Sequence, residues 1–138
     1  PTRRSSDLGA PPPDDLEFVP IFQEQLMLVL QAHPQPFRFA AFAEGCTYRA
    51  MGEAFLAQSE EAEIEIQDVG SYHAMLACVA SGGYAGIVPL SVLETLTLPE
   101  ASQLQPVGQA ITQLIWRKGY ASPALEKMRQ LLESASDL

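Results

Sequence analysis

Two segments decide the fold of this chain: FAEGCTYRAMGEAFL at residues 42–56 and GSYHAMLACVASGGYAGIVP at residues 70–89. In each segment, a turn of small and polar residues runs directly into an apolar pattern typical of a helix. The first amides of such a helix have no partner within the helix, and the helix dipole concentrates positive charge at the same point. Both turns are therefore predicted to suit a small anionic or polar ligand.

Strands and helices are predicted to alternate around these two segments. The predicted strands are 16–22 with an interruption at Pro20, 25–31, 37–42, 63–67, 85–88, 104–108 and 110–117. The predicted helices are 47–58, 72–81, a short one over 89–96, and a C-terminal one that begins at Ser122-Pro123. Strands that alternate with helices of this length indicate an α/β fold with a mostly parallel sheet.

The composition of the helices predicts how they start, stop and pack. Thr47, Ser71 and Ser122 are the expected N-caps, and Gly82-Gly83 is the expected left-handed end of the second helix. The helix over 72–81 is apolar nearly all round, so it is expected to be largely buried. The C-terminal helix is expected to bury one stripe of residues, and Trp116 and Tyr120 are expected to pack at the strand end and beneath it. The stripe consists of Leu125, Met128, Leu131 and Leu132.

Composition narrows the class of protein. With 138 residues, 47% of them hydrophobic, the chain is expected to form one domain or one large piece of a domain. It carries 17 acidic and 8 basic residues, which argues against direct nucleic-acid binding and favours a solvated acidic face. Cys46 and Cys78 lack the spacing of a zinc site and fit a reducing compartment. No apolar run reaches membrane-spanning length and no signal peptide is seen, so a cytoplasmic location is expected.

Three motifs in this order and spacing resemble the effector-binding half of LysR-type bacterial transcription regulators. They are Gly45-Cys46-Thr47-Tyr48-Arg49, Ser71-Tyr72-His73-Ala74-Met75-Leu76-Ala77-Cys78-Val79 and Leu114-Ile115-Trp116-Arg117. The resemblance extends from about Gly9 to the C-terminus. It implies a periplasmic-binding-protein-like (type 2) effector domain, in which two α/β subdomains joined by two crossover strands hold a small inducer, without catalysis, cofactor or metal.

The resemblance also implies a domain organisation. Residues 1–8 are expected to be a non-native or disordered leader, and residues 9–22 a remnant of the first subdomain. Residues 23–105 would be the complete second subdomain, and residues 106–138 the return to the first. The winged helix-turn-helix would lie outside this sequence, so DNA would be reached only through that domain, in a homodimer or homotetramer without membrane contact. The incomplete first subdomain is expected to leave apolar surface exposed.

The predicted effector site combines the two turns. Its members are Cys46, Thr47, Tyr48, Arg49, Ser71, Tyr72 and His73. The effector would be a small molecule, anionic or amino-acid-like. Thr47 and Ser71 are also explained as plain helix caps, Arg49 as the partner of Glu53, and His73 as a structural or solvated histidine. Cys46, next to a positive helix end, is a less favoured candidate for a redox sensor.

Two other function classes are alternatives to a regulator. A solute-binding protein of a transport system would have a similar fold, and would carry a secretory leader or a lipid-anchor cysteine. A small α/β enzyme would need a nucleophile and a base, and the sequence has no G-x-S-x-G motif around its serines. The two histidines and scattered carboxylates do not form a metal-binding pattern.

Overall fold

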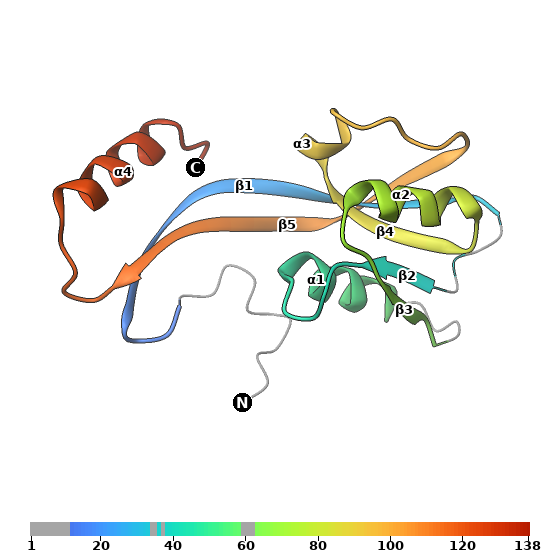
Figure 1. Cartoon of the computed structure of the whole chain (residues 1–138), viewed down its shortest axis with the longest axis horizontal. Helices are drawn as coiled ribbons and strands as arrows, with labels where there is room; N and C mark the ends of the chain where they lie inside the picture. Colours follow the sequence, from blue (N-terminus) through green and yellow to red (C-terminus); the bar gives the residue numbers. More distant parts are fainter. Residues whose placement is uncertain (1–11, 34–35, 37, 59–62) are drawn as a thin grey trace. The chain divides into compact units, whose positions relative to one another are not determined.

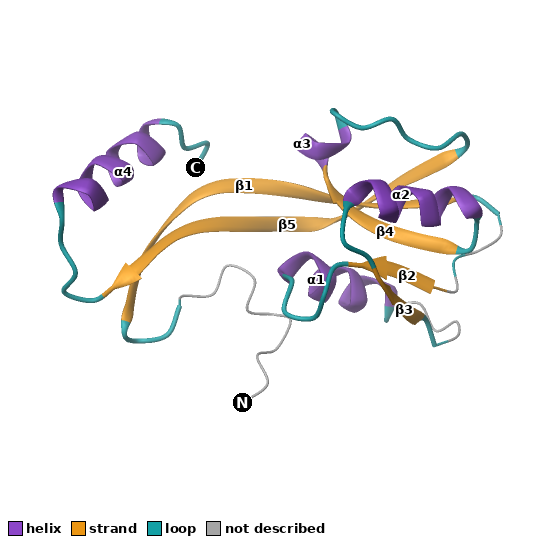
Figure 2. Ribbon diagram, in the orientation of Figure 1, coloured by secondary structure: helices purple, strands orange, loops and turns teal. Residues whose placement is uncertain are grey.

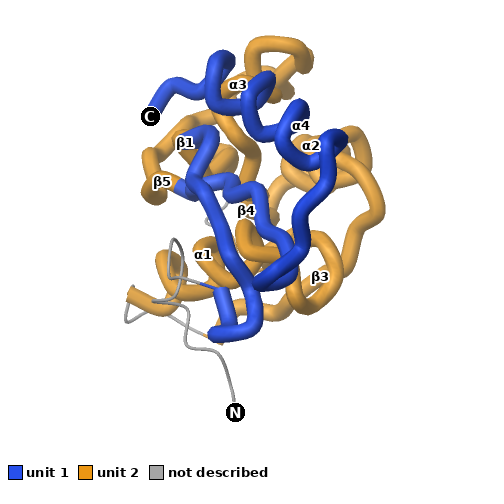
Figure 3. The backbone as a smooth tube through the Cα atoms, turned by 90° about the vertical axis from the view of Figure 1, so that its left-hand side faces the viewer, with its two compact units in different colours: residues 1–24, 110–138 blue, residues 25–109 orange. Residues whose placement is uncertain are grey.

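The computed structural model describes residues 12–33, 36, 38–58 and 63–138 (Figure 1). In chain order the elements are β1 (Leu16–Gln31), β2 (Arg38–Ala41), α1 (Thr47–Leu56), β3 (Glu65–Asp68), α2 (Tyr72–Ser81), β4 (Tyr84–Pro89), α3 (Leu90–Leu93), β5 (Ser102–Arg117) and α4 (Pro123–Ser134). The chain divides into unit 1, residues 1–24 and 110–138, and unit 2, residues 25–109 (Figure 3). The expected leader, residues 1–8, lies outside the described residues.

The strands form one sheet in the order β3-β2-β4-β1-β5. β2 pairs in parallel with both β3 and β4, with Phe39 opposite Ile66 and Ala85. β1 pairs antiparallel with β4, with Leu28 opposite Ile87. The α/β fold is therefore confirmed, and the sheet is mixed because β1 runs against the parallel strands beside it.

β1 and β5 are each one long strand where the sequence predicted two shorter ones. Pro20 does not interrupt β1, although proline has no amide to donate to a neighbouring strand. β1 pairs with β4 only over Leu26 to Leu30. Pro20 lies outside this segment, so its missing amide removes no hydrogen bond to β4. β5 likewise continues through Gly108 and Gln109.

The core of unit 2 lies between the sheet and the helices that cover it. It includes Val29, Ala40, Met75, Leu76, Val79, Val88 and Leu93. Two glycines allow a close approach: a Cβ added to Gly52 would overlap Phe39 Cζ, and one added to Gly86 would lie 2.6 Å from Met75 Cγ. The sheet and its helices therefore meet closely enough that a methyl group at either position would clash.

α2 spans the predicted residues, but it is not largely buried as expected. Met75, Leu76 and Val79 are buried, whereas Ala74, Ala77 and Ala80 are exposed. A helix that covers one face of a sheet buries only one stripe, and alanines on the opposite side expose little apolar area. Gly82 ends the helix with φ 83° and ψ 151°, so it has a positive φ without the left-handed helical ψ that was expected.

Other elements differ from the sequence prediction at their ends or in their burial. α1 ends at Leu56, and α3 is limited to four residues. β3 was expected to have one wet face, yet all four of its residues are exposed. β3 is the edge of the sheet, which explains why neither of its faces is covered.

Unit 1 contains residues 16–24 of β1, residues 110–117 of β5, and α4. The expected buried stripe of α4 is absent from the described residues, because Met128 is 52% exposed and Leu131 is 57% exposed. Tyr120, expected to pack beneath this helix, is also 57% exposed. Two strand segments offer a face too narrow to bury the apolar side of a helix, so the amphipathic pattern remains without a complete partner.

Polar and cationic contacts attach α4 within unit 1. Ser122 accepts a hydrogen bond from the Leu125 amide at 3.1 Å, which confirms it as the N-cap. The Trp116 indole donates to Glu17 at 2.7 Å, and the Arg129 guanidinium lies 4.9 Å from the centre of the Trp116 ring. In the described part of the chain, no helix is long and apolar enough to cross a membrane.

Candidate functional site

The two predicted turns follow the carboxyl ends of neighbouring strands (Figure 2). β2 and β3 are parallel, and their last residues, Ala41 and Asp68, lie opposite each other. The Val69 amide continues this pairing by donating to the Ala41 carbonyl at 2.9 Å. Because parallel neighbours end at the same edge of a sheet, the turns that lead into α1 and α2 emerge together, at the edge where ligands bind in many α/β folds.

The first turn, residues 42–46, begins α1 without the hydroxyl cap that was expected. Cys46, with φ −71° and ψ 125°, is the N-cap residue, and its side chain makes no capping hydrogen bond. Thr47 is the first helical residue and is exposed, so its prediction as the cap is wrong. Gly45 has φ +95°, which few residues other than glycine adopt, and the helix that follows begins at Thr47, as predicted, with Cys46 in place of Thr47 as its N-cap.

The second turn, residues 69–71, begins α2 with the predicted cap. Ser71 accepts a hydrogen bond from the Ala74 amide at 3.1 Å. Ser71 and His73 are exposed, whereas Tyr72 is half-buried with its ring edge-on to Phe42 at 5.0 Å. Phe42 belongs to the first turn, so this aromatic contact joins the two turns.

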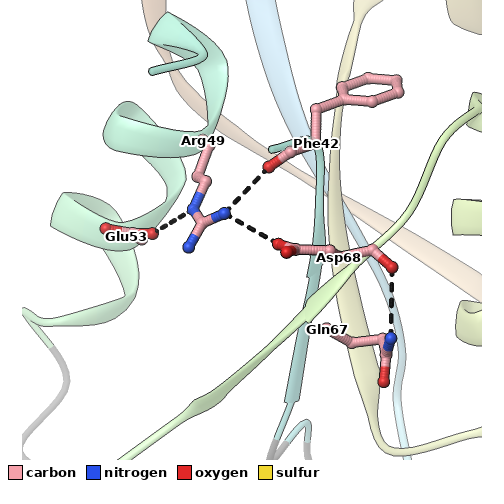
Figure 4. Close-up of polar contacts among 5 residues, drawn as sticks. All are labelled: Phe42, Arg49, Glu53, Gln67 and Asp68. Atoms are coloured by element: carbon pink, nitrogen blue, oxygen red, sulfur yellow. Dashed lines mark hydrogen bonds and ion pairs between the residues drawn. The ribbon is translucent and has the colours of Figure 1, made fainter. Parts of the chain in front are cut away.

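Arg49 makes three polar contacts, of which the sequence predicted one (Figure 4). Its Nε donates to Glu53 at 2.7 Å, the predicted pair. Its Nη1 donates to Asp68 at 2.9 Å and to the Phe42 carbonyl at 3.2 Å. The hydrogen bond to Glu53 is the largest cause of a raised pKa at Arg49, so the guanidinium stays charged. The sequence contained no signal for Asp68, because its contact depends on the pairing of β2 with β3.

The chemistry that this arrangement offers is binding through amides and hydroxyls. Helix N-termini concentrate partial positive charge and orphan donors, and both open at the same sheet edge. The exposed side chains beside them are Thr47, Ser71 and His73. Among the residues that the structure describes, no group of His, Cys, Asp and Glu could hold a metal ion.

Unit 1 has a separate hollow of about 440 Å³ that the sequence did not predict. Glu17, Trp116, Tyr120, Ser122 and Arg129 contribute to its lining. Glu17 accepts a hydrogen bond from the Trp116 indole at 2.7 Å, and the Arg129 guanidinium lies 3.9 Å from Glu126, which also contributes to the lining.

Comparisons with known proteins place this geometry in a family. The model of the protein family described as "LysR substrate binding domain" matches residues 7–137 of this chain. No significant match is found among curated protein sequences. Similar solved structures include regulatory domains and a full-length regulator, and at their low sequence identities the similarity shows a shared fold.

A sulfate-bound mutant regulatory domain of OxyR2 from Vibrio vulnificus has a TM-score of 0.68 and 17% identity, over 96% of this chain and 76% of that one. The CcmR regulatory domain of Synechocystis PCC6803, in complex with 2-PG, has a TM-score of 0.70 and 14% identity, over 92% and 70%. Full-length CbnR in complex with its target DNA has a TM-score of 0.59 and 21% identity, over 91% of this chain and 50% of that one.

These matches confirm the periplasmic-binding-protein-like fold and the resemblance of the three sequence motifs. They give no support to a solute-binding protein of a transport system. The chain belongs to the LysR substrate-binding-domain family, and its function is effector sensing in a LysR-type transcription regulator.

Proposed function

We propose that the two turns hold one small anionic effector. The observation that carries this proposal is the shared edge at which the parallel strands β2 and β3 end and α1 and α2 begin. The amides of both helix starts, with the side chains of residues 46–48 and 71–73, supply the donors. A carboxylate, including that of an amino acid, and a phosphate or sulfate group would all suit these donors.

Two relatives support an anionic effector. The OxyR2 mutant regulatory domain is sulfate-bound, and the CcmR regulatory domain was solved with 2-PG. Sulfate is an anion whose oxygens accept hydrogen bonds from amides and hydroxyls. The net charge of −9 on this chain opposes anion binding at long range, so local donors must supply the attraction.

We propose further that unit 2 corresponds to the second effector subdomain, 23–105, and that residues 9–22 and 106–138 belong to the first. A bound effector would favour one relative orientation of the subdomains, by its difference in affinity for the two states. In a homodimer or homotetramer this bias would change how the N-terminal domains contact DNA. The role is one of binding without catalysis, in the cytoplasm.

The direct test is a titration of the whole 15N-labelled chain with sodium sulfate, followed by NMR. We expect saturable shifts in the amides of residues 46–49 and 71–74, described by a single dissociation constant. Sodium chloride at equal ionic strength is the control for non-specific screening. Shifts confined to the hollow of unit 1, or identical shifts in chloride, would contradict the proposal.

A further inference from the structure

We propose that Arg49 is a positioning residue, which holds the two effector-binding turns in register and does not itself bind the effector. The inference rests on the function proposed above for these turns. Its basis is the set of three contacts that the guanidinium makes with α1 and with the ends of β2 and β3 (Figure 4).

Each contact of Arg49 reaches a different part of the site. Glu53 lies one turn further along α1, and its carboxylate fixes Nε against the helix. The second acceptor is the carbonyl of Phe42, which is the first residue of the turn that leads into α1. The third is Asp68, the last residue of β3, which lies three residues before Ser71. One nitrogen, Nη1, donates to both Phe42 and Asp68. A single guanidinium therefore contacts the first turn and the end of the strand that leads into the second.

The chemistry of arginine suits this role. Its planar fork presents several donors in a fixed geometry, whereas a lysine ammonium is a single flexible point charge. The Arg49 side chain is only 16% exposed, while Glu53 and Asp68 are 44% and 70% exposed. The bridging cation is therefore the most covered member of the cluster, and solvent screens its contacts less than an exposed pair.

The local charge argues against direct attraction of an anion by Arg49. One positive guanidinium faces two carboxylates, those of Glu53 and Asp68, which leaves the cluster with a net charge of about −1 by simple addition. An incoming anion would have to compete with both acids. The positive potential at this edge must come from the helix N-termini, whose positions Arg49 sets.

The same two strands provide a matched control at their opposite ends. Arg38 begins β2 and pairs with Glu65, the first residue of β3, at 3.1 Å. The two residues lie opposite each other, three positions before the pair of Ala41 and Asp68. Arg38→Lys and Glu65→Gln therefore disturb an ion pair between the same strands without touching either turn.

The first experiment measures amide hydrogen exchange in the whole chain without ligand. The reporters are the Ala50 amide, which donates to the Cys46 carbonyl, and the Ala74 amide, which donates to Ser71. We expect Arg49→Lys to raise exchange roughly fivefold or more at both amides, although position 49 lies on α1 alone. Arg38→Lys should leave both unchanged. A rise at Ala50 without a rise at Ala74 would overturn the proposal.

The second experiment measures sulfate affinity, and its outcome depends on whether Asp68→Asn tightens or weakens binding. If Arg49 bound the anion directly, Asp68→Asn would remove a competing carboxylate and tighten binding. The positioning role predicts the reverse, with binding about fivefold weaker in Asp68→Asn than in Glu65→Gln, which has the same net charge. Arg49→Lys, which keeps the positive charge, should weaken binding as much as Arg49→Gln. Tighter binding in Asp68→Asn, or full affinity in Arg49→Lys, would overturn the proposal.

The two measurements separate this inference from the proposed function. If the wild-type chain binds no sulfate at either turn, the anion-binding function fails. Exchange at Ala50 and Ala74 then decides the positioning role alone. Thermal melts of all five single-site variants show whether any of them lowers stability enough for a change in affinity to be a consequence of unfolding.

Discussion

Units 1 and 2 differ in how completely they bury similar amphipathic patterns. Among the residues that the structure describes, unit 2 holds fourteen of the sixteen buried hydrophobic residues, and unit 1 holds Ile21 and Ala110. α2 buries Met75, Leu76 and Val79, whereas none of the described residues of α4 is buried. The comparison shows that an apolar stripe predicts which side of a helix can be buried. How much of that side is buried depends on the elements that pack around the helix.

The largest expected difference between the units is in amide exchange. The strands β2 and β4 lie in the core of unit 2, so their amides should exchange only through nearly global unfolding. The α4 amides should exchange through local opening, on the order of a thousandfold faster, because few buried contacts oppose that opening. Hydrogen–deuterium exchange followed by NMR measures both sets together. Equal protection in α4 and β4 would show that α4 is covered in solution.

Methionine truncation should show the same contrast in stability. Met75→Ala is expected to lower the free energy of unfolding by about 2–5 kcal/mol, because Met75 is 1% exposed and packs in the core. Met128→Ala on α4 is expected to change it by about 0.5 kcal/mol or less, as for other surface positions. Urea titration of both variants provides the measurement. A similar loss in the two variants would contradict the difference in burial.

The close approach of α1 to the sheet predicts a smaller effect. Gly52→Ala should destabilise the chain by about 1–3 kcal/mol, because the new methyl group would clash with Phe39 and Ile87. Gly70→Ala is the matched control, since no heavy atom lies within 4 Å of its added Cβ. Thermal unfolding compares the two variants. If Gly52→Ala were stabilising, the higher helix propensity of alanine would outweigh the clash.

The two helix starts of unit 2 predict the smallest effects. Ser71→Ala removes the hydroxyl that caps α2 and should cost about 1 kcal/mol. Thr47→Ala should cost less than about 0.5 kcal/mol, because Thr47 lies inside α1 and does not cap it. Urea unfolding distinguishes the two. An equal loss in both would indicate that Thr47 caps α1 in solution.

Local features were predicted well where short-range physics decides them. The Ser71 and Ser122 caps, the full span of α2 and the pair of Arg49 with Glu53 each depend on residues within a few positions. The cap of α1 was misplaced because Gly45, rather than the hydroxyl of Thr47, sets where that helix begins.

Long-range features could not be predicted in the same way. The Asp68 contact of Arg49 spans 19 residues and needs the parallel register of β2 and β3. The continuity of β1 through Pro20 depends on where its pairing with β4 stops. The assignment of seven residues to an effector site remains a prediction. The shared edge of the two turns supports six of them, and Arg49 is proposed instead to position the turns.

The sequence by itself determined the type of most elements, the family motifs and the two turns, because propensities, caps and periodicity act over a few residues. Only the tertiary structure decided which apolar stripes were buried and which acids Arg49 would contact. Burial and ion pairing depend on surfaces that other parts of the chain supply, and strand register brings those surfaces together. The exposed apolar stripe of α4 and the three contacts of Arg49 are the two clearest examples of features that only the tertiary structure decided.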